Sequence, residues 1–281
     1  MRRAIPWLTL VVLGGLLTIA ISVILNTHNN PTAKVVSTQP TPKIESLAVP
    51  FPEINPKARA LDIPIIMYHD VRPIKDIDWD ITPKHLEKQF KTIQQNGITP
   101  ITLEQLVEHL RTGSALPAKP ILLTFDDNYL GEYLYAFPLL KKYHYPAVWS
   151  VHTNYVGNQV GKPKANWSQV KEMSHSGLIT IASHTVNHLR LDKLSPEKVD
   201  YELQESKRVL EKQLGVAINY FTYPEGDFLD SVKDQVTKAG YQAALTMSLD
   251  EKKEGPANKS EDLLSIMRYG QSRFEEIIAN M

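Results

Sequence analysis

The feature that most constrains this chain is a regular alternation of short apolar runs and longer amphipathic segments from about residue 60 onward. The apolar runs predict strands at residues 63–68, 98–101, 121–125, 147–151, 178–182, 219–223 and 241–246. Helical spacing predicts helices at 82–97, 102–111, 129–143, 168–177, 195–215 and 229–239, with N-caps expected at Thr82, Thr102 and Ser168. Such alternation is typical of a parallel β/α architecture, either a barrel or an open doubly wound sheet. In both, active residues gather at the carboxyl ends of the strands.

The N-terminal segment has a different character. Arg2 and Arg3 precede an uncharged run from Ala4 to Leu25. A membrane span needs about 20 apolar residues, whereas the apolar region of a cleaved signal peptide has roughly 7–15. We therefore expect residues 1–25 to be a transmembrane signal anchor that leaves the bulk of the chain outside the cytoplasm. A cleaved signal peptide is the alternative, and it would give a secreted protein.

Composition limits the remaining organisation. Residues 26–58 hold six prolines among Thr, Ser and Lys and predict an extended linker, so residues 59–281 remain as the folded domain. Lys+Arg and Asp+Glu are both 31, without a basic stripe, so we expect no nucleic-acid partner. The absence of cysteine excludes disulfides, thiolate metal sites and cysteine nucleophiles. We expect a monomer.

Polar residues stand at several predicted strand ends. Asp126 and Asp127 follow the strand at 121–125, and His184 and His188 follow the strand at 178–182. Two imidazoles and one carboxylate make a three-ligand metal set that leaves positions open for water and substrate. From spacing alone, either Asp127 or Asp126 is a candidate third ligand, and solvated loop histidines are the alternative.

Further candidates follow other strands. His69 ends the first, and the run Tyr223-Pro-Glu-Gly226 ends the sixth. His152 ends the fourth strand, where we expect it to pack, and a position lining the cleft is the alternative. Most other histidines fall on predicted helices or loops and are interpreted as surface or packing residues.

The run Thr124-Phe-Asp-Asp127, followed by Ser183-His-Thr-x-x-His188, resembles the polysaccharide deacetylases of carbohydrate esterase family 4, which carry the nodulation-protein-B homology domain. The resemblance covers about residues 60–270. It implies an irregular (β/α)7 barrel, which would follow the one N-terminal transmembrane helix expected from residues 1–25. It also implies that Asp126 is the catalytic base and that Asp127, His184 and His188 hold one divalent metal, usually Zn²⁺.

The remaining roles depend on the same resemblance. Phe221 to Gly226 is similar to the third family motif, in which the residue after the proline, here Glu225, offers its backbone N–H to the oxyanion, and Tyr223 is a supporting residue. Thr222 stands where many members have the arginine that orients the base, so that arginine is missing or comes from elsewhere.

The expected general acid lies near the N-terminal end of the domain. No histidine follows His188, and Met67-Tyr-His69 resembles the poly-N-acetylglucosamine deacetylase branch, so His69 is the expected general acid. Arg268 resembles that branch's C-terminal Leu-x-Arg stretch and is expected to be structural or to help at the site.

The expected function is that of a hydrolase acting on linear amides. It would remove N-acetyl groups from an N-acetylglucosamine-containing exopolysaccharide or peptidoglycan outside the cytoplasm, with the polysaccharide and the membrane as partners. An O-acetyl esterase acting on xylan or another acetylated glycan is one alternative. An inactive surface module that binds glycans is another.

Overall fold

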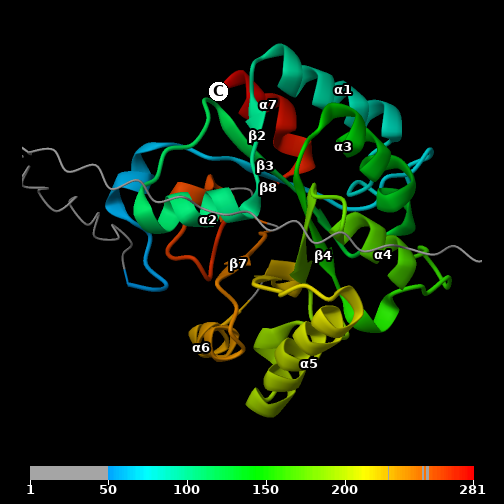
Figure 1. The fold of residues 1–281 in the computed structure, drawn as a ribbon, viewed down its shortest axis with the longest axis vertical. Coiled ribbons are helices and arrows are strands. Elements are labelled where there is room, and N and C mark those ends of the chain that lie inside the picture. Colours follow the sequence, from blue (N-terminus) through cyan, green and yellow to red (C-terminus); the bar gives the residue numbers. More distant parts are fainter. Residues whose placement is uncertain (1–49, 227, 249, 251–252) are drawn as a thin grey trace, which may run out of the picture. The chain divides into compact units, whose positions relative to one another are not determined.

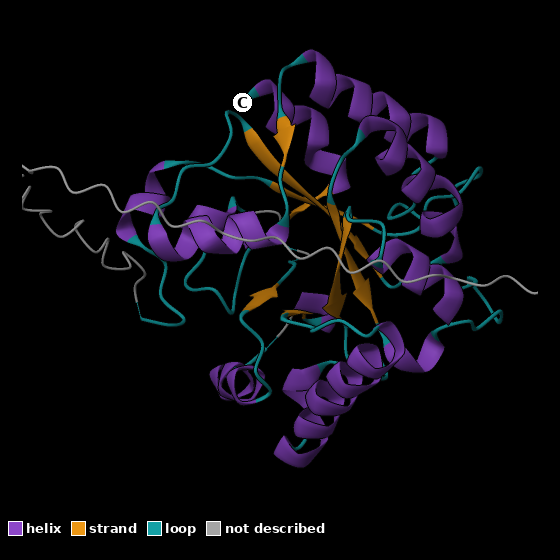
Figure 2. Ribbon diagram, in the orientation of Figure 1, coloured by secondary structure: helices purple, strands orange, loops and turns teal. Residues whose placement is uncertain are grey.

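A parallel sheet forms the centre of the part of the chain that the computed structural model describes, residues 50–226, 228–248, 250 and 253–281 (Figures 1 and 2). The sheet has eight strands, and its main path runs β7-β6-β5-β4-β3-β1-β8. The strands are β1 (Ile65–Tyr68), β2 (Thr99–Pro100), β3 (Pro120–Asp126), β4 (Ala147–Val151), β5 (Ile179–Ser183), β6 (Tyr220–Thr222), β7 (Ala243–Leu245) and β8 (Tyr269–Gly270). Strand β2 pairs with the start of β3. The predicted parallel α/β class is confirmed.

The two ends of the sheet are linked through residues 266–270. Ile266 forms a parallel bridge with Leu245 of β7, and its N–H donates to the Ala244 carbonyl at 2.9 Å. A few residues later, β8 pairs with β1. This linkage is consistent with the expected (β/α)7 barrel. It depends on a segment for which the sequence analysis predicted no strand.

Helices lie around the strands (Figure 2). They are α1 (Pro83–Gln95), α2 (Leu103–Thr112), α3 (Phe137–Tyr143), α4 (Trp167–Ser174), α5 (Pro196–Leu214), α6 (Asp230–Lys238) and α7 (Phe274–Ala279). The predicted N-caps of α1 and α2 are confirmed, because the Thr82 hydroxyl accepts from the His85 N–H and Thr102 forms a capping box with Gln105. Short 3-10 segments are η1 (Pro56–Ala60), η3 (Thr153–Tyr155), η4 (Leu191–Lys193), η5 (Pro224–Gly226), η7 (Ala257–Lys259) and η8 (Gln271–Arg273).

Three helical details differ from expectation. The helix expected at 129–143 begins with a π-helical turn, η2 (Glu132–Ala136), before α3. Helix α4 begins at Trp167, because Asn166 and Gln169 form a capping box two residues before the expected cap at Ser168. Helix α7 was not predicted.

The end of the expected linker also differs. Ile54 and Ala58 are buried, and the Asn55 N–H donates to the Leu110 carbonyl at the end of α2 at 2.7 Å. Residues 54–58 therefore pack on the domain. The predicted anchor, residues 1–25, and most of the linker lie outside the described residues. Among the described residues, none of the helices combines the length and the apolar character that a membrane crossing requires.

The core follows the two-residue period of the strands. One buried cluster takes alternate strand residues from a single face of the sheet, namely Ile65, Leu122, Val148, Ala182, Tyr220, Ala243 and Leu245. The residues between them face the surrounding helices and include Ile66, Leu123, Trp149, Ile181, Phe221 and Ala244. The same period decides which side chains reach the site.

Candidate active site

The strand period brings the chemical groups together. Counting in steps of two from the first cluster, five strands lead to a polar residue at or just after their carboxyl ends, in chain order His69, Asp126, His152, His184 and Thr222. All the strands are parallel, so these ends meet at one edge of the sheet. The apolar face therefore becomes polar at its carboxyl end.

Asp126 is held by an arginine. The Arg268 guanidinium donates from Nη1 to Asp126 Oδ1 at 3.0 Å and from Nη2 to Oδ2 at 2.7 Å, and both side chains are almost fully buried. Arg268 also donates to the Thr246 carbonyl and the Thr124 hydroxyl. Burial raises the pKa of Asp126, but the charge and hydrogen bonds of Arg268 outweigh burial and lower it to about 2. Asp126 is therefore a carboxylate at neutral pH.

This ion pair shows where the arginine that many family members have at the position of Thr222 comes from in this chain. Instead of a guanidinium, Thr222 presents a hydroxyl that hydrogen-bonds the Ser150 hydroxyl at 2.8 Å. The arginine that faces Asp126 comes instead from the segment that links the sheet ends. Sequence order did not reveal this substitution, because Arg268 and Asp126 lie 142 residues apart.

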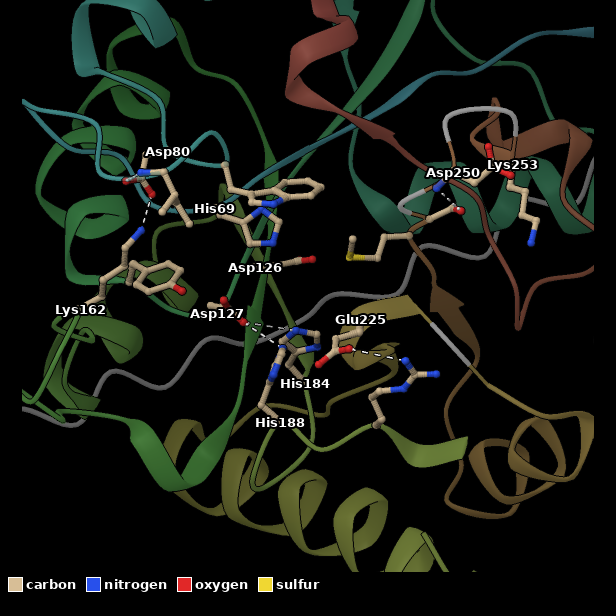
Figure 3. A pocket seen from close by; sticks show the side chains of 16 residues that line it. His69, Asp80, Asp126, Asp127, Lys162, His184, His188, Glu225, Asp250 and Lys253 are labelled. Atoms are coloured by element: carbon tan, nitrogen blue, oxygen red, sulfur yellow. Dashed lines mark hydrogen bonds and ion pairs between the residues drawn. The ribbon is translucent and has the colours of Figure 1, made fainter. Parts of the chain in front are cut away.

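Asp127 faces the two histidines predicted to share a metal with it (Figure 3). Its Oδ1 lies 3.2 Å from His188 Nε2 and 3.5 Å from His184 Nε2. Asp127 has a φ of 81°, in the left-handed region, so its side chain does not continue the alternation of β3 side chains between the two faces of the sheet. Burial raises the pKa of Asp127, yet the neighbouring His184 holds it well below its usual range.

The ligand atoms are arranged as metal binding requires. His184 Nδ1 lies 2.7 Å from the Thr222 carbonyl, so Nδ1 carries a proton and Nε2, which faces Asp127, is the nitrogen left to bind a metal. Burial lowers the pKa of His188 to about 4, so its ring is neutral at neutral pH. The donor atoms of Asp127, His184 and His188 lie within 4.8 Å of one another. Two imidazoles and one carboxylate at this spacing fit a divalent ion such as Zn²⁺.

A buried glutamate shapes the loop that carries both histidines. Glu202 of α5 accepts from the Val186 and Asn187 N–H groups through Oε2 at 2.8 and 2.9 Å. Its Oε1 accepts from the Asn187 side chain at 2.7 Å. Thr185 and His188 have φ values of 70° and 54°, so the loop needs such support. Glu202 was not predicted as a site residue, although an acidic residue beside Leu203 on the apolar face of a helix was an available signal.

His69 lies across the same cavity, whose volume is about 490 Å³ (Figure 3). Burial lowers the pKa of His69, while the carboxylates of Asp126 and Asp127 act in the opposite direction. Its ring lies edge-on to Trp79 at 5.2 Å between centroids. The cavity is also lined by apolar and charged side chains, namely Ile77, Trp79, Met247, Asp80, Lys162, Arg190, Asp250 and Lys253.

Glu225 and Tyr223 occupy different places. Glu225 lines the cavity in a left-handed conformation, with φ 55°, and its side chain lies 3.9 Å from Arg190. The next residue, Gly226, has no room for a side chain, because a Cβ there would lie 2.0 Å from the Met247 carbonyl oxygen. Tyr223 belongs to the opposite face of β6 and is buried, stacked on Phe228 at 4.5 Å between centroids. Tyr223 therefore does not line the cavity, and the support predicted for it would come from packing behind the cavity wall.

Comparison with known proteins identifies this arrangement. Residues 113–244 match the family model described as polysaccharide deacetylase. These residues form a polysaccharide deacetylase domain. The domain agrees with the resemblance to carbohydrate esterase family 4 that the two motifs indicated, and a deacetylase domain is that of a hydrolase.

Individual relatives agree with this assignment. The deacetylase is 28% identical over 207 residues to YxkH of Bacillus subtilis, a protein named after the same family, with 73% of this chain and 70% of YxkH covered. It is 26% identical over 232 residues to the poly-β-1,6-N-acetyl-D-glucosamine N-deacetylase of Staphylococcus aureus, with 79% and 78% covered. The Escherichia coli protein of that name is matched over only 31% of its length.

A solved structure supports the fold. The Streptococcus pyogenes deacetylase PplD, solved in complex with acetate, superposes with a TM-score of 0.70 at 26% identity. The match covers 79% of this chain and 98% of PplD.

Proposed function

We propose that this deacetylase removes N-acetyl groups from poly-N-acetylglucosamine outside the cytoplasm and that it uses one divalent metal, most simply Zn²⁺. One observation carries the proposal: the Arg268–Asp126 pair lies beside Asp127, His184 and His188 in a single cavity. The substrate is inferred from relatives named poly-β-1,6-N-acetyl-D-glucosamine N-deacetylase.

Asp127, His184 and His188 would hold the metal. The proton on His184 Nδ1 and the neutral ring of His188 favour this role, because imidazole binds metals through an unprotonated nitrogen. A divalent ion at this position would polarise the acetyl carbonyl and promote ionisation of water.

The chain's own residues then account for the movement of protons. Asp126, ionised and fixed by Arg268, accepts a proton from the attacking water as its oxygen bonds to the acetyl carbon. The backbone N–H of Glu225 donates to the developing oxyanion. His69 protonates the sugar nitrogen as the C–N bond breaks, releasing acetate and leaving an amine. Burial lowers the pKa of His69, and the carboxylates of Asp126 and Asp127 act against burial by favouring the protonated form that a general acid needs.

The proposal includes the location of the domain outside the cytoplasm. A signal anchor at residues 1–25 would place the domain outside the cell membrane, where an exopolysaccharide is accessible, and a linker would separate the domain from the membrane. Fusion of a reporter enzyme that is active only outside the cytoplasm to the C-terminus of the chain tests this topology. An inactive reporter in an expressed fusion would contradict it.

The activity test compares three glycans. Metal-free protein, with and without added Zn²⁺, is incubated with β-1,6-linked N-acetylglucosamine oligomers, peptidoglycan strands or acetylated xylan, and released acetate is measured. We expect Zn²⁺-dependent acetate release that is fastest from the β-1,6-linked oligomers. Release from xylan alone would indicate an O-acetyl esterase, and equal rates with and without metal would contradict metal dependence.

A further inference from the structure

His152 lies beside the three candidate metal ligands, and neither the metal set nor the proposed proton transfers involve it. It directly follows β4 and is only 4% exposed. Its Nε2 is 3.9 Å from Asp127 Oδ1, the same oxygen that faces His184 and His188. Its buried Nδ1 has no hydrogen-bond partner among the described residues. A polar ring buried in this way is expected to have a function at the site.

The backbone fixes His152 relative to the loop that carries the two histidines. The His184 N–H donates to the Val151 carbonyl at 3.0 Å, immediately before His152. The Thr153 N–H donates to the Thr185 carbonyl at 3.1 Å, immediately after it. Asn154 continues the pairing with the carbonyl of residue 186. The end of β4 and this loop are therefore one hydrogen-bonded unit, with His152 in its middle.

The ring of His152 also restricts the ring of His188, one of the candidate metal ligands. It lies edge-on to His188, with 5.6 Å between centroids, and it also contacts the ring of Tyr155, with 5.0 Å between centroids. Rotation of the His188 ring would meet the His152 ring. His152 thus contacts one candidate ligand through a polar atom and another through its ring edge.

We propose that His152 is a positioning residue for the metal site, where its Nε2–H holds the Asp127 carboxylate and its ring fixes that of His188. This inference rests on the metal site of the proposed function. A shift of less than about 1 Å brings Nε2 within hydrogen-bond distance of Asp127. Groups that hold ligands in this way typically change metal affinity by about 10–100-fold.

The test measures zinc affinity of the full chain by competition with a chelating indicator. His152→Phe and His152→Met remove the N–H donor, whereas His152→Gln keeps one. Tyr155→Phe is the matched control, because it alters the other neighbour of the His152 ring without touching a ligand. Thermal unfolding of each metal-free variant shows whether it folds, and either donor-free variant that folds serves the test.

We expect the donor-free variants to bind zinc about 10–100-fold more weakly. His152→Gln should recover most of the affinity, and Tyr155→Phe should bind like wild type. The visible spectrum of the Co²⁺-loaded protein should keep its band positions in the His152 variants, because the ligand set is unchanged.

The outcomes separate this inference from the proposed function. A wild-type chain that binds no zinc would remove the metal site itself, and this inference with it. Zinc binding by wild type and the donor-free variants with equal affinity would overturn only the role of His152. A change in the Co²⁺ spectrum on substitution would make His152 a ligand and would also overturn the positioning role.

Discussion

Arg268 and Asp126 form a buried, two-pronged ion pair, with Nη1 3.0 Å from Oδ1 and Nη2 2.7 Å from Oδ2. The pair fixes both oxygens of the carboxylate proposed as the base. Two planar groups matched in this way restrict orientation as well as charge. The pair therefore supports both the stability of the fold and the geometry of the proposed reaction.

We predict that Arg268→Met impairs both properties. Removing one partner of a buried ion pair leaves an uncompensated charge and costs about 3–5 kcal/mol of unfolding free energy. Loss of the oriented base should reduce turnover by about 10²–10⁴-fold. Urea unfolding and acetate release measure the two effects. Arg268→Lys, which keeps the charge without the planar fork, should recover stability better than turnover, and native turnover in Arg268→Met would contradict the orienting role.

The two adjacent aspartates should respond differently to substitution. Asp127→Ala removes a proposed ligand and should lose zinc, whereas Asp126→Asn should keep zinc and lose turnover by about 10²–10⁴-fold. Metal content after dialysis and acetate release measure the two effects. His184→Ala is the matched variant for metal loss. A zinc-loaded Asp126→Asn protein with near-normal activity would exclude Asp126 as the base.

His69 should matter for turnover and not for metal content. It lines the cavity opposite the three ligands, and His69→Ala removes the group proposed to protonate the leaving amine. We expect zinc binding to persist and acetate release to fall by about 10²–10⁴-fold. A substrate whose leaving group needs no proton, such as an activated aryl acetate, should be affected much less. Near-normal release from the glycan would exclude His69 as the acid.

Asp70 should make the stability pH-dependent. It is 4% exposed, its Oδ1 has no hydrogen-bond partner among the described residues, and burial raises its pKa to about 6. The unfolded value is about 4, so the folded state binds the proton more tightly. The contribution of Asp70 is therefore fully present below about pH 4 and is lost as the pH rises to about 6.

Asp70→Asn tests this sign. Its unfolding free energy relative to wild type should increase between pH 4 and 6, because the variant cannot lose that proton. Urea unfolding of both proteins at several pH values measures the difference. A difference that stays constant across this range would show that Asp70 does not titrate as expected.

Local patterns predicted the elements that depend on local chemistry. The caps at Thr82 and Thr102, the strand ends at Asp126 and His184, and the parallel class all follow from spacing and capping. The arrangement of Asp127, His184 and His188 agrees with the motif-based expectation in geometry.

Contacts between distant segments were not predictable in the same way. Strand β8 has only two residues, too few for a periodic signal, and its pairing with β1 depends on the completed sheet. The partner of Asp126 and the buried position of Glu202 likewise arise only when segments far apart in the chain meet. His152 was expected to pack, and its burial agrees, but its approach to Asp127 required the register of β4 against β3.

The linkage of β7 to β1 by residues 266–270 makes a segment that is synthesised after all three candidate metal ligands a condition for catalytic activity. A nascent chain that stops before residue 266 already contains Asp127, His184 and His188, yet it lacks the guanidinium that orients Asp126. Such a chain would be able to gather metal ligands without aligning a base. Hydrolytic activity would therefore appear only after the C-terminal segment has docked, and its onset during refolding would report the moment at which the ring of strands closes.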